Sequence, residues 1–245
     1  GPQVSSTATI LEPNPIDVTE SIVCASCNGL SDGSITINVT GENDDFTYLW
    51  NVTGSTTTSS TGLAANTYSV LITPTNGCPP HTEYITMCEP AALDLTDITP
   101  VDVSCFGENN GSISLIPTGG TGAGTYSYLW SDGQVTSTAI NLVAGTYTCE
   151  VTDNNGCTET TAPIPITQPA LVTTGLDTTD ISCFGLSDGS AEVNPTGVTG
   201  ASYAVSWNFG PPSNINIVPL QDGTHYVEVI NTITGCSSGI ESFTI

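Results

Sequence analysis

Cysteines are the residues of this chain with the clearest covalent chemistry, and six of the nine recur at fixed places. Three of them open a Cys-x-Gly turn, and the steps between these three are both 78 residues: Cys27, Cys105 and Cys183. Three more follow a glycine in a second recurring turn: Cys78, Cys157 and Cys236. So many cysteines in a loop-rich chain indicate disulfides and an oxidising compartment. We therefore expect an extracellular protein.

Oxygen-rich turns form the second group with possible chemistry. The sequence Asp153-Asn154-Asn155-Gly156 and the Ser-Asp-Gly-Ser sequences at Asp32 and Asp188 offer carboxylate and amide oxygens, which Ca²⁺ prefers. The same residues are ordinary turn formers, so Asp32, Asp153 and Asp188 are only weak calcium candidates. A denser acidic loop, at Glu42, Asp44 and Asp45, is most simply a solvated loop. No other cofactor is expected.

A catalytic constellation is not visible in the sequence. His81 and His225 are not at equivalent places, and neither has the cysteine or carboxylate spacing of a zinc site. No Gly-x-Ser-x-Gly elbow and no phosphate-binding loop is present. The sequence therefore predicts no catalytic residue and no enzyme.

The cysteine turns belong to a tandem repeat of about 78 residues, the step between successive Cys-x-Gly turns. A unit of that size can bury its own core, so we expect three domains, at residues 14–91, 92–170 and 171–245. Gly1-Pro2 resembles a protease scar. Residues 10–13 match the ends of the first two repeats, so residues 1–13 are predicted to be this scar and the last strand of a preceding repeat.

Short alternating runs between turn clusters predict an all-β chain of three tandem immunoglobulin-like sandwiches, of the PKD or fibronectin type III kind, in an elongated array. Each repeat has a tryptophan on the third strand, and two have a tyrosine early on the sixth. These five residues are the predicted core markers: Trp50, Trp130, Trp207, Tyr68 and Tyr147. His225 replaces the tyrosine in the third repeat, which puts the tyrosine-corner bond there in doubt.

Two disulfide schemes fit the sequence. The within-repeat scheme pairs Cys27 with Cys78, Cys105 with Cys157, and Cys183 with Cys236. In a sandwich, however, these two turns lie at opposite ends, roughly 20–30 Å apart, whereas a disulfide needs Cα atoms within about 7 Å. The preferred cross-repeat scheme therefore joins one repeat to the next.

The preferred scheme pairs Cys27 with Cys157 and Cys105 with Cys236, and leaves Cys78 and Cys183 to partners in other repeats. Cys24 and Cys88 form an additional pair in the first repeat, where the first strand and the end of the last strand run side by side. Cys149 is a buried thiol, because its equivalents are Val70 and Val227.

The charge balance limits the partners. The chain has 24 acidic residues and no Lys or Arg, where an average protein devotes roughly 12% of its residues to the two basic types. Nothing in it can neutralise a phosphate, so nucleic acid and anionic membranes are excluded as electrostatic partners.

The recurring motifs resemble those of a known family. They are Cys-x-Gly-x-x-(Asp/Asn)-Gly-Ser, Gly-Gly-Thr-Gly, Tyr-x-Tyr-x-Trp, Leu-x-x-Gly-Thr-Tyr-x-x-x-Val-x-Asp-x-x-Gly-Cys and Ile-Thr-Gln-Pro-Ala, all present in the second repeat. They are similar to the SprB repeat of giant cell-surface adhesins in gliding Bacteroidetes. The resemblance covers nearly the whole chain. It implies export by the type IX secretion system and a place on mobile surface filaments associated with the outer membrane.

Two functions follow as hypotheses. In the first, the repeats are a force-bearing stalk segment whose partners are neighbouring repeats of the same chain. In the second, the repeats are themselves adhesive modules for extracellular polysaccharide or a solid surface, and the divergent loop of residues 208–212 is the most plausible contact.

Overall fold

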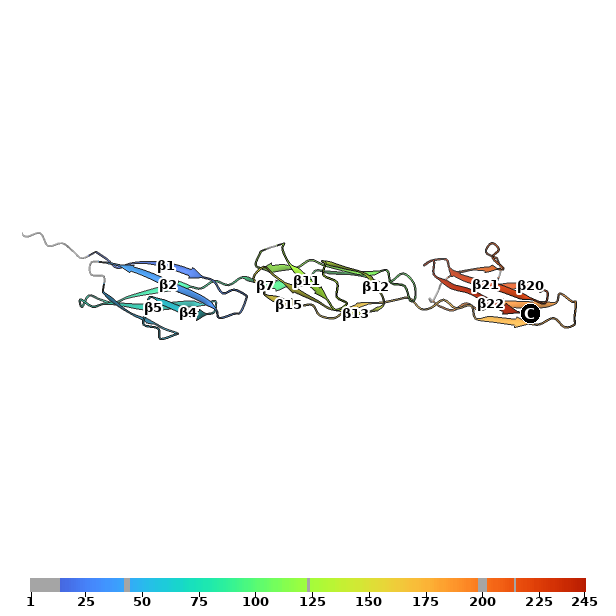
Figure 1. Ribbon diagram of the computed structural model, residues 1–245, viewed down its shortest axis with the longest axis horizontal. Helices are drawn as coiled ribbons and strands as arrows, with labels where there is room; N and C mark the ends of the chain where they lie inside the picture. The colour runs from blue at the N-terminus through green and yellow to red at the C-terminus, as the bar shows by residue number, and fades with distance from the viewer. Residues whose placement is uncertain (1–13, 42–44, 123, 198–201, 214) are drawn as a thin grey trace, which may run out of the picture. The chain divides into compact units, whose positions relative to one another are not determined.

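The computed structural model describes residues 14–41, 45–122, 124–197, 202–213 and 215–245 (Figure 1). These residues form strands and turns, and no helix occurs among them. The described part of the chain therefore contains no helix long and apolar enough to cross a membrane. The expected strand of residues 10–13 lies outside these ranges, as do Glu42 and Asp44 of the acidic loop.

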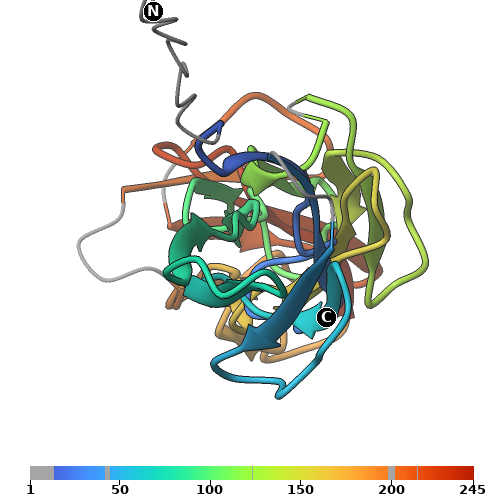
Figure 2. The ribbon, with the colours of Figure 1, turned by 90° about the vertical axis from the view of Figure 1, so that its left-hand side faces the viewer.

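The first repeat is a sandwich of two three-stranded antiparallel sheets. One sheet has the order β1-β2-β4 and the other β3-β5-β6, coloured blue to teal in the view of Figure 2. The strands are β1 (Asp17–Val23), β2 (Gly33–Thr40), β3 (Phe46–Trp50), β4 (Ser59–Leu63), β5 (Thr67–Pro74) and β6 (His81–Thr86). Strands 1, 2 and 5 of the sandwich thus pair together, and strands 3, 6 and 7 form the other sheet if the short fourth strand is counted. This is the immunoglobulin-like arrangement.

The second repeat has the same strands with one division. Its sheets are β12-β9-β8 and β11-β14-β15, with two further pairs, β13-β16 and β10-β7. The strands are β7 (Ala91–Asp94), β8 (Ile98–Val101), β9 (Gly111–Leu115), β10 (Thr118–Gly120), β11 (Ser127–Trp130), β12 (Thr138–Leu142), β13 (Gly145–Tyr147), β14 (Cys149–Thr152), β15 (Thr158–Thr160) and β16 (Ile164–Ile166). The strand expected to run through residues 147–151 is therefore interrupted at Thr148.

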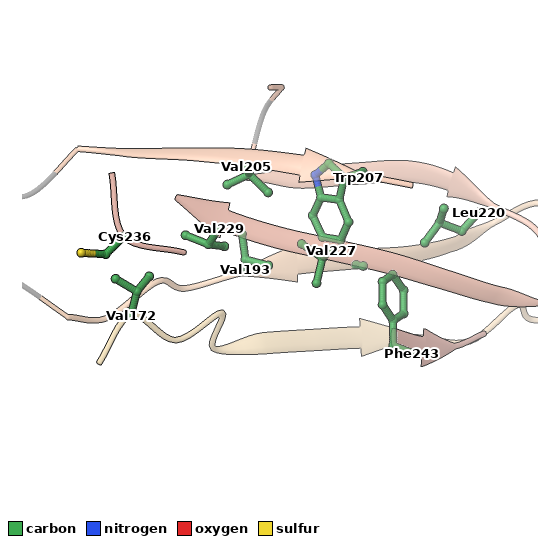
Figure 3. Packing of buried hydrophobic residues seen from close by; sticks show 10 residues of the cluster. Val172, Val193, Val205, Trp207, Leu220, Val227, Val229, Cys236 and Phe243 are labelled. Atoms are coloured by element: carbon green, nitrogen blue, oxygen red, sulfur yellow. The ribbon is translucent and has the colours of Figure 1, made fainter. Parts of the chain in front are cut away.

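The third repeat again has two three-stranded sheets, β17-β18-β20 and β19-β21-β22. The strands are β17 (Leu176–Thr179), β18 (Gly189–Val193), β19 (Tyr203–Trp207), β20 (Asn216–Leu220), β21 (Thr224–Asn231) and β22 (Ser237–Thr244). Figure 3 shows its core, where Trp207 lies beside Val227 and Phe243 between the sheets. The rings of Trp207 and Phe243 meet edge to face at 6.0 Å.

The sequence motif Asp/Asn-Gly-Ser begins the second strand of each repeat because its glycine has no room for a side chain. A Cβ on Gly33 would lie 2.9 Å from the Met87 sulfur and 3.0 Å from the Leu63 carbonyl oxygen. The equivalent glycines, Gly111 and Gly189, meet the same three surroundings in their own repeats. The last strand of each repeat therefore packs directly on this glycine.

Contacts group the chain into two compact units that do not follow the repeat boundaries predicted from sequence. The first consists of residues to Asp94 with Pro117–Tyr126 and Val151–Glu159, and the second of Leu95–Ile116, Ser127–Glu150 and Thr160–Ile245. One end of the second repeat thus belongs to the same unit as the first repeat. The boundaries at residues 91 and 170 remain predictions from the repeat period.

Candidate functional site: the disulfide-bonded turns

The Cys-x-Gly turn is organised by the acidic or amide residue that precedes the invariant glycine of β2, β9 or β18. Asp32 accepts from the backbone N–H of Ser26 at 2.9 Å and also from its hydroxyl. Asp188 makes the same two bonds to Ser182, at 3.0 and 2.5 Å. In the second repeat an amide does this work, since Asn110 accepts from the Ser104 N–H at 2.9 Å. The three turns therefore share one construction.

A residue from the end of the same repeat also contacts this turn. The Gly29 N–H donates to Glu89 Oε2 at 2.7 Å, and the Gly107 N–H donates to Gln168 Oε1 at 2.9 Å. Sequence reasoning aligned these Glu-Pro and Gln-Pro sequences without giving them a role. Their recurrence 61 or 60 residues after the glycine was the available signal.

Three disulfides are present: Cys24–Cys88, Cys27–Cys157 and Cys105–Cys236. Their Cα atoms are 4.8, 5.7 and 5.5 Å apart, which is within the usual range. The last two are the pairs of the cross-repeat scheme, and each lies inside one compact unit. Each joins a Cys-x-Gly turn to the Gly-Cys turn of the following repeat.

The within-repeat pairing is not formed, because Cys78 and Cys183 keep free thiols while Cys157 and Cys236 are bonded elsewhere. The strand register of the first repeat gives the reason. Val23 pairs with Ser34 at the end that leads to Cys27, whereas the chain reaches Cys78 from the other end, where Phe46 pairs with Pro74. Strands of eight residues separate these two ends by roughly 25 Å.

The Cys27–Cys157 junction has polar contacts beside the disulfide. The carbonyl oxygen of Ser26 accepts from Asn155 Nδ2 at 2.9 Å and lies 3.4 Å from Cys157 Sγ. At the other junction, Cys236 Sγ lies 3.2 Å from the Ser104 carbonyl oxygen. The bonded sulfurs carry no hydrogen, so these two sulfur distances are contacts. The carbonyl before the cysteine thus faces the incoming turn in both places.

Asp153 holds the Gly-Cys turn of this first junction. It is buried, with 6% of its surface exposed, and Oδ1 accepts from the N–H groups of Asn155 and Cys157, both at 2.9 Å. Oδ2 accepts from the N–H and hydroxyl of Thr121 at 2.8 and 3.0 Å. Burial raises the pKa of this carboxyl, but these hydrogen bonds outweigh it, and the pKa lies below its ordinary value of 3.8.

Asp153→Asn is expected to reduce stability at neutral pH and to weaken acid sensitivity. A folded-state pKa below the unfolded one contributes stability above the unfolded value, and this stability disappears as pH falls through the folded value. The wild-type free energy of unfolding should therefore fall more steeply below about pH 4 than that of the variant. Denaturant unfolding at pH 7, 4 and 2 measures both effects. The exposed Asp132→Asn is the control, and equal acid slopes in the wild type and Asp153→Asn would contradict the prediction.

The calcium candidates use their oxygens for turn bonds in the structure. Asp32 and Asp188 are exposed, and each bonds the serine six residues earlier, while Asp153 receives four donors. The lowered pKa of Asp32 and Asp188 comes first from their serine hydroxyls and then from the serine N–H groups. In the described part of the chain, no three His, Cys, Asp or Glu residues form a group that could hold a metal ion.

The predicted core markers are buried with one exception. Trp50, Trp130 and Trp207 are 2%, 2% and 5% exposed, and Tyr68 is 6% exposed. Tyr147 is only half-buried, so its assignment to the core was wrong. The reason is the interruption at Thr148, which leaves Tyr147 on the short strand β13, paired with Ile164 of β16.

The corner bond of the immunoglobulin-like fold is present in all three repeats. The hydroxyl groups of Tyr68 and Tyr147 donate to the carbonyl oxygens of Ala64 and Val143, both at 3.0 Å. His225 makes the equivalent contact from Nε2 to Gln221 O, also at 3.0 Å. The doubt about the third corner was therefore misplaced, because imidazole can supply the same donor four residues after the acceptor.

The remaining singled-out side chains are spread over the fold. His81 Nε2 lies 2.9 Å from Glu83 Oε2 on the same strand. The Cys149 thiol is fully buried, and that burial raises its pKa. Asp45, the described member of the acidic loop, is exposed, and its carbonyl oxygen accepts from the Thr75 N–H.

The loop after β19 carries an exposed aromatic pair. Phe209 is 70% exposed and packs on Tyr226, with ring centroids 5.0 Å apart. Asn208 and Phe209 have φ angles of 49° and 61°, a conformation that costs energy for residues other than glycine. Asn208 holds it by accepting from the Tyr226 N–H at 2.9 Å. Ile240, which is 58% exposed, also borders this surface, the Phe209 patch.

Comparisons with solved structures return tandem immunoglobulin-like domains at low identity. The three N-terminal domains of the bacteriophage RB49 outer capsid protein Hoc are 12% identical, with a TM-score of 0.42, and the match covers 94% of this chain and 96% of that one. Titin domains A168–A170 give 14%, 0.30, 94% and 99%, and the eight N-terminal domains of Down syndrome cell adhesion molecule give 12%, 0.32, 96% and 36%. No curated protein sequence matches the chain.

A protein-family profile does match, at three places separated by nearly the repeat period. The profile is that of the SprB repeat, and it covers residues 19–56, 98–135 and 175–211. Each match contains one Cys-x-Gly turn and the tryptophan of the third strand. The chain is therefore identified as a set of three SprB repeats with immunoglobulin-like folds.

Proposed function

We propose that this chain is a force-bearing spacer segment of an exported cell-surface protein. The observation that carries the proposal is that Cys27–Cys157 and Cys105–Cys236 each join one repeat to the next. A disulfide within a domain would protect only that domain. One that links successive domains gives the chain a covalent path that does not depend on either domain staying folded.

The two disulfides overlap along the sequence, which limits how far the chain can extend. The backbone between Cys27 and Cys236 spans 209 residues. A path that crosses both disulfides uses only the 52 residues between Cys105 and Cys157. Even with every strand pulled apart, the chain between these cysteines cannot become longer than this shorter path allows.

Single-molecule stretching tests the proposal directly. The full chain is held at its two termini and extended with its disulfides intact and again after reduction. Reduction should release 157 further residues, the difference between the two paths, or about 520–570 Å of contour length at 3.3–3.6 Å per residue. An equal contour length in both conditions would exclude the covalent bypass. The variant Cys78→Ser, which removes a free thiol, should behave as the wild type.

The location and biological setting in this proposal rest on the family. SprB repeats, three disulfides and an acidic surface without Lys or Arg suit a cell-surface, extracellular site. The resemblance to adhesins of gliding Bacteroidetes supports a role in gliding or surface attachment and export by the type IX system. The proposal assigns no catalytic activity and no calcium ion to the repeats.

The Phe209 patch favours a second candidate function, adhesion to neutral polysaccharide. Exposed aromatic rings stack on the apolar faces of sugars, and the two consecutive positive φ angles hold Phe209 outward at an energetic cost. The aromatic pair is special to the third repeat, since the residues equivalent to Phe209 and Tyr226 are Val52 with Ser69 and Asp132 with Thr148. Glu228 borders the patch and offers an acceptor for sugar hydroxyls.

Phe209→Ala should abolish any retention of the chain on immobilised neutral glucans while leaving the fold intact. The side chain is mostly exposed, so thermal unfolding should change little. Val52→Ala, at the equivalent place in the first repeat, is the matched control. Affinity electrophoresis in gels containing the glucan measures retention. Retention that is the same in Phe209→Ala and the wild type would exclude this patch as the adhesive surface.

A further inference from the structure

Two free thiols lie in turns whose counterparts are bonded to each other elsewhere in the chain. Cys183 opens the same turn as Cys27 and Cys105, and Cys78 closes the same turn as Cys157 and Cys236. In both junctions the first kind of turn receives the second kind. Cys183 and Cys78 are thus the two complementary halves of a third junction.

The Cys183 turn already has the conformation of the bonded turns. The Leu186 N–H donates to the Cys183 carbonyl oxygen at 3.1 Å, as the equivalent groups do at 3.2 Å in the first two repeats. The third residue of the turn is a glycine with a φ of 82°, compared with 75° and 77° for Gly29 and Gly107. Asp188 fixes Ser182 as Asp32 fixes Ser26. This half of the junction is preformed.

The Cys78 turn matches its bonded counterparts in the same way. Gly77 has a φ of 86°, and the glycines before Cys157 and Cys236 have φ values of 85° and 77°. The Cys78 N–H donates to Asn76 Oδ1 at 3.1 Å, which orients the turn. Its cysteine is half-buried and its partner Cys183 is exposed, so both thiols can be reached.

The aromatic residue beside Cys183 gives an independent indication of a missing partner. Phe184 follows Cys183 directly and is 99% exposed. Phe106 follows Cys105, at the bonded junction, and only 49% of it is exposed. A phenylalanine with nearly its whole surface in water gains free energy when a neighbour covers it. The open turn therefore presents both a thiol and an apolar contact.

We propose that the Cys183 turn of one molecule binds the Cys78 turn of a second copy of this chain, and that the two thiols form a disulfide. The contact is heterologous, because each copy contributes a different surface, so repetition yields linear or closed head-to-tail assemblies. The inference rests on the two observed junctions and does not need the mechanical role proposed above.

The bond formation requires a two-electron oxidant, which is a small-molecule disulfide such as oxidised glutathione. The Cys183 thiolate attacks one glutathione sulfur, forms a mixed disulfide and expels one glutathione thiolate. The Cys78 thiolate of the second copy then attacks the Cys183 sulfur and expels the second glutathione. Two protein thiols and one glutathione disulfide thus become one protein disulfide and two glutathione thiols.

Complementary variants test the pairing. Cys183→Ser keeps only the Cys78 half, and Cys78→Ser keeps only the Cys183 half. Each full chain is incubated alone and as an equal mixture with oxidised glutathione, at high salt to screen the repulsion between two chains of charge −24. Non-reducing electrophoresis gives the size. Cleavage by an acid-directed protease and mass spectrometry identify the linked peptides.

The expected result is a disulfide-linked dimer in the mixture, none in either variant alone, and a ladder of larger species from the wild type. The linked peptides should contain Cys78 and Cys183. The proposal is overturned if the single variants dimerise as well as the mixture, if the mixture stays monomeric, or if the wild type closes Cys78 onto Cys183 within one molecule. The failure of this test would leave the stretching result unaffected, since that depends on Cys27–Cys157 and Cys105–Cys236.

The second repeat supplies a further control for recognition by the turn itself. Asp188→Asn places the residue that serves at Asn110, so dimer formation with the Cys78 partner should proceed as before. Asp188→Ala removes the bonds to Ser182 while leaving the Cys183 thiol in place, and dimer formation should slow. Equal rates for Asn and Ala at this position would show that the preformed turn is not used, and would also overturn the proposal.

Discussion

Trp50→Ala is expected to destabilise the first repeat by about 3–5 kcal/mol, enough to unfold it under mild conditions. Trp50 is 2% exposed and packs in a cluster with Ile35, Leu63 and Val70. Its indole N–H donates to the Thr57 carbonyl oxygen at 3.0 Å. Alanine leaves a cavity between the sheets and an acceptor without this donor. Hydrogen exchange of strands β2 and β5 measures the loss for this repeat separately from the others.

Tyr84→Ala is the matched control, because it removes a large aromatic ring from the same sandwich at a position that is 70% exposed. A surface change of this kind usually stays within about 0.5 kcal/mol. If Tyr84→Ala cost as much as Trp50→Ala, the two-sheet core would not be the source of the stability of this repeat.

Replacing both Cys27 and Cys157 with serine should lower the free energy of unfolding of the first unit by about 5 kcal/mol in the chain-entropy estimate. This disulfide closes a loop of 130 residues, whereas Cys24–Cys88 closes one of 64. Removing both partners avoids a new free thiol that could exchange with Cys78. Denaturant unfolding gives the free energy, and hydrogen exchange should show the largest loss of protection at residues 151–159, which Asp153 and the disulfide hold together.

Cys78→Ser serves as the control, since this cysteine is free and half-buried, and the change should alter stability by less than about 1 kcal/mol. An unchanged free energy in Cys27→Ser with Cys157→Ser would mean that the junction is held by its hydrogen bonds alone.

The fold could be predicted from the sequence to a large extent, because its signals are local and repeated. Alternation placed Trp50, Trp130 and Trp207 on one face of the third strand, and all three are buried. The Asp-Gly-Ser motif repeated at a fixed period, so each new copy supported the same strand. What alternation could not show was the interruption at Thr148, which depends on pairing between β13 and β16 and left Tyr147 half-buried.

The junctions depended on contacts that sequence spacing does not reveal. The cross-repeat cysteine pairs followed from the length of a strand, which is a physical limit on distance. The bond from Gly29 to Glu89 and the contact of Asn155 with Ser26 join residues 60 and 129 positions apart. Such bonds require the path of the chain through both turns. His225 shows a related limit, because a different residue type supplies the donor expected from tyrosine.

The overlap of Cys27–Cys157 with Cys105–Cys236 also bears on damage to the chain. Every peptide bond between residues 27 and 236 lies inside at least one of these two loops, and those between 105 and 157 lie inside both. A single cleavage anywhere in that region therefore leaves the two fragments covalently attached. Separation requires a second cut at a suitable place or chemical reduction. A protein exposed to the proteases of its surroundings would thus retain its continuity after the first nick.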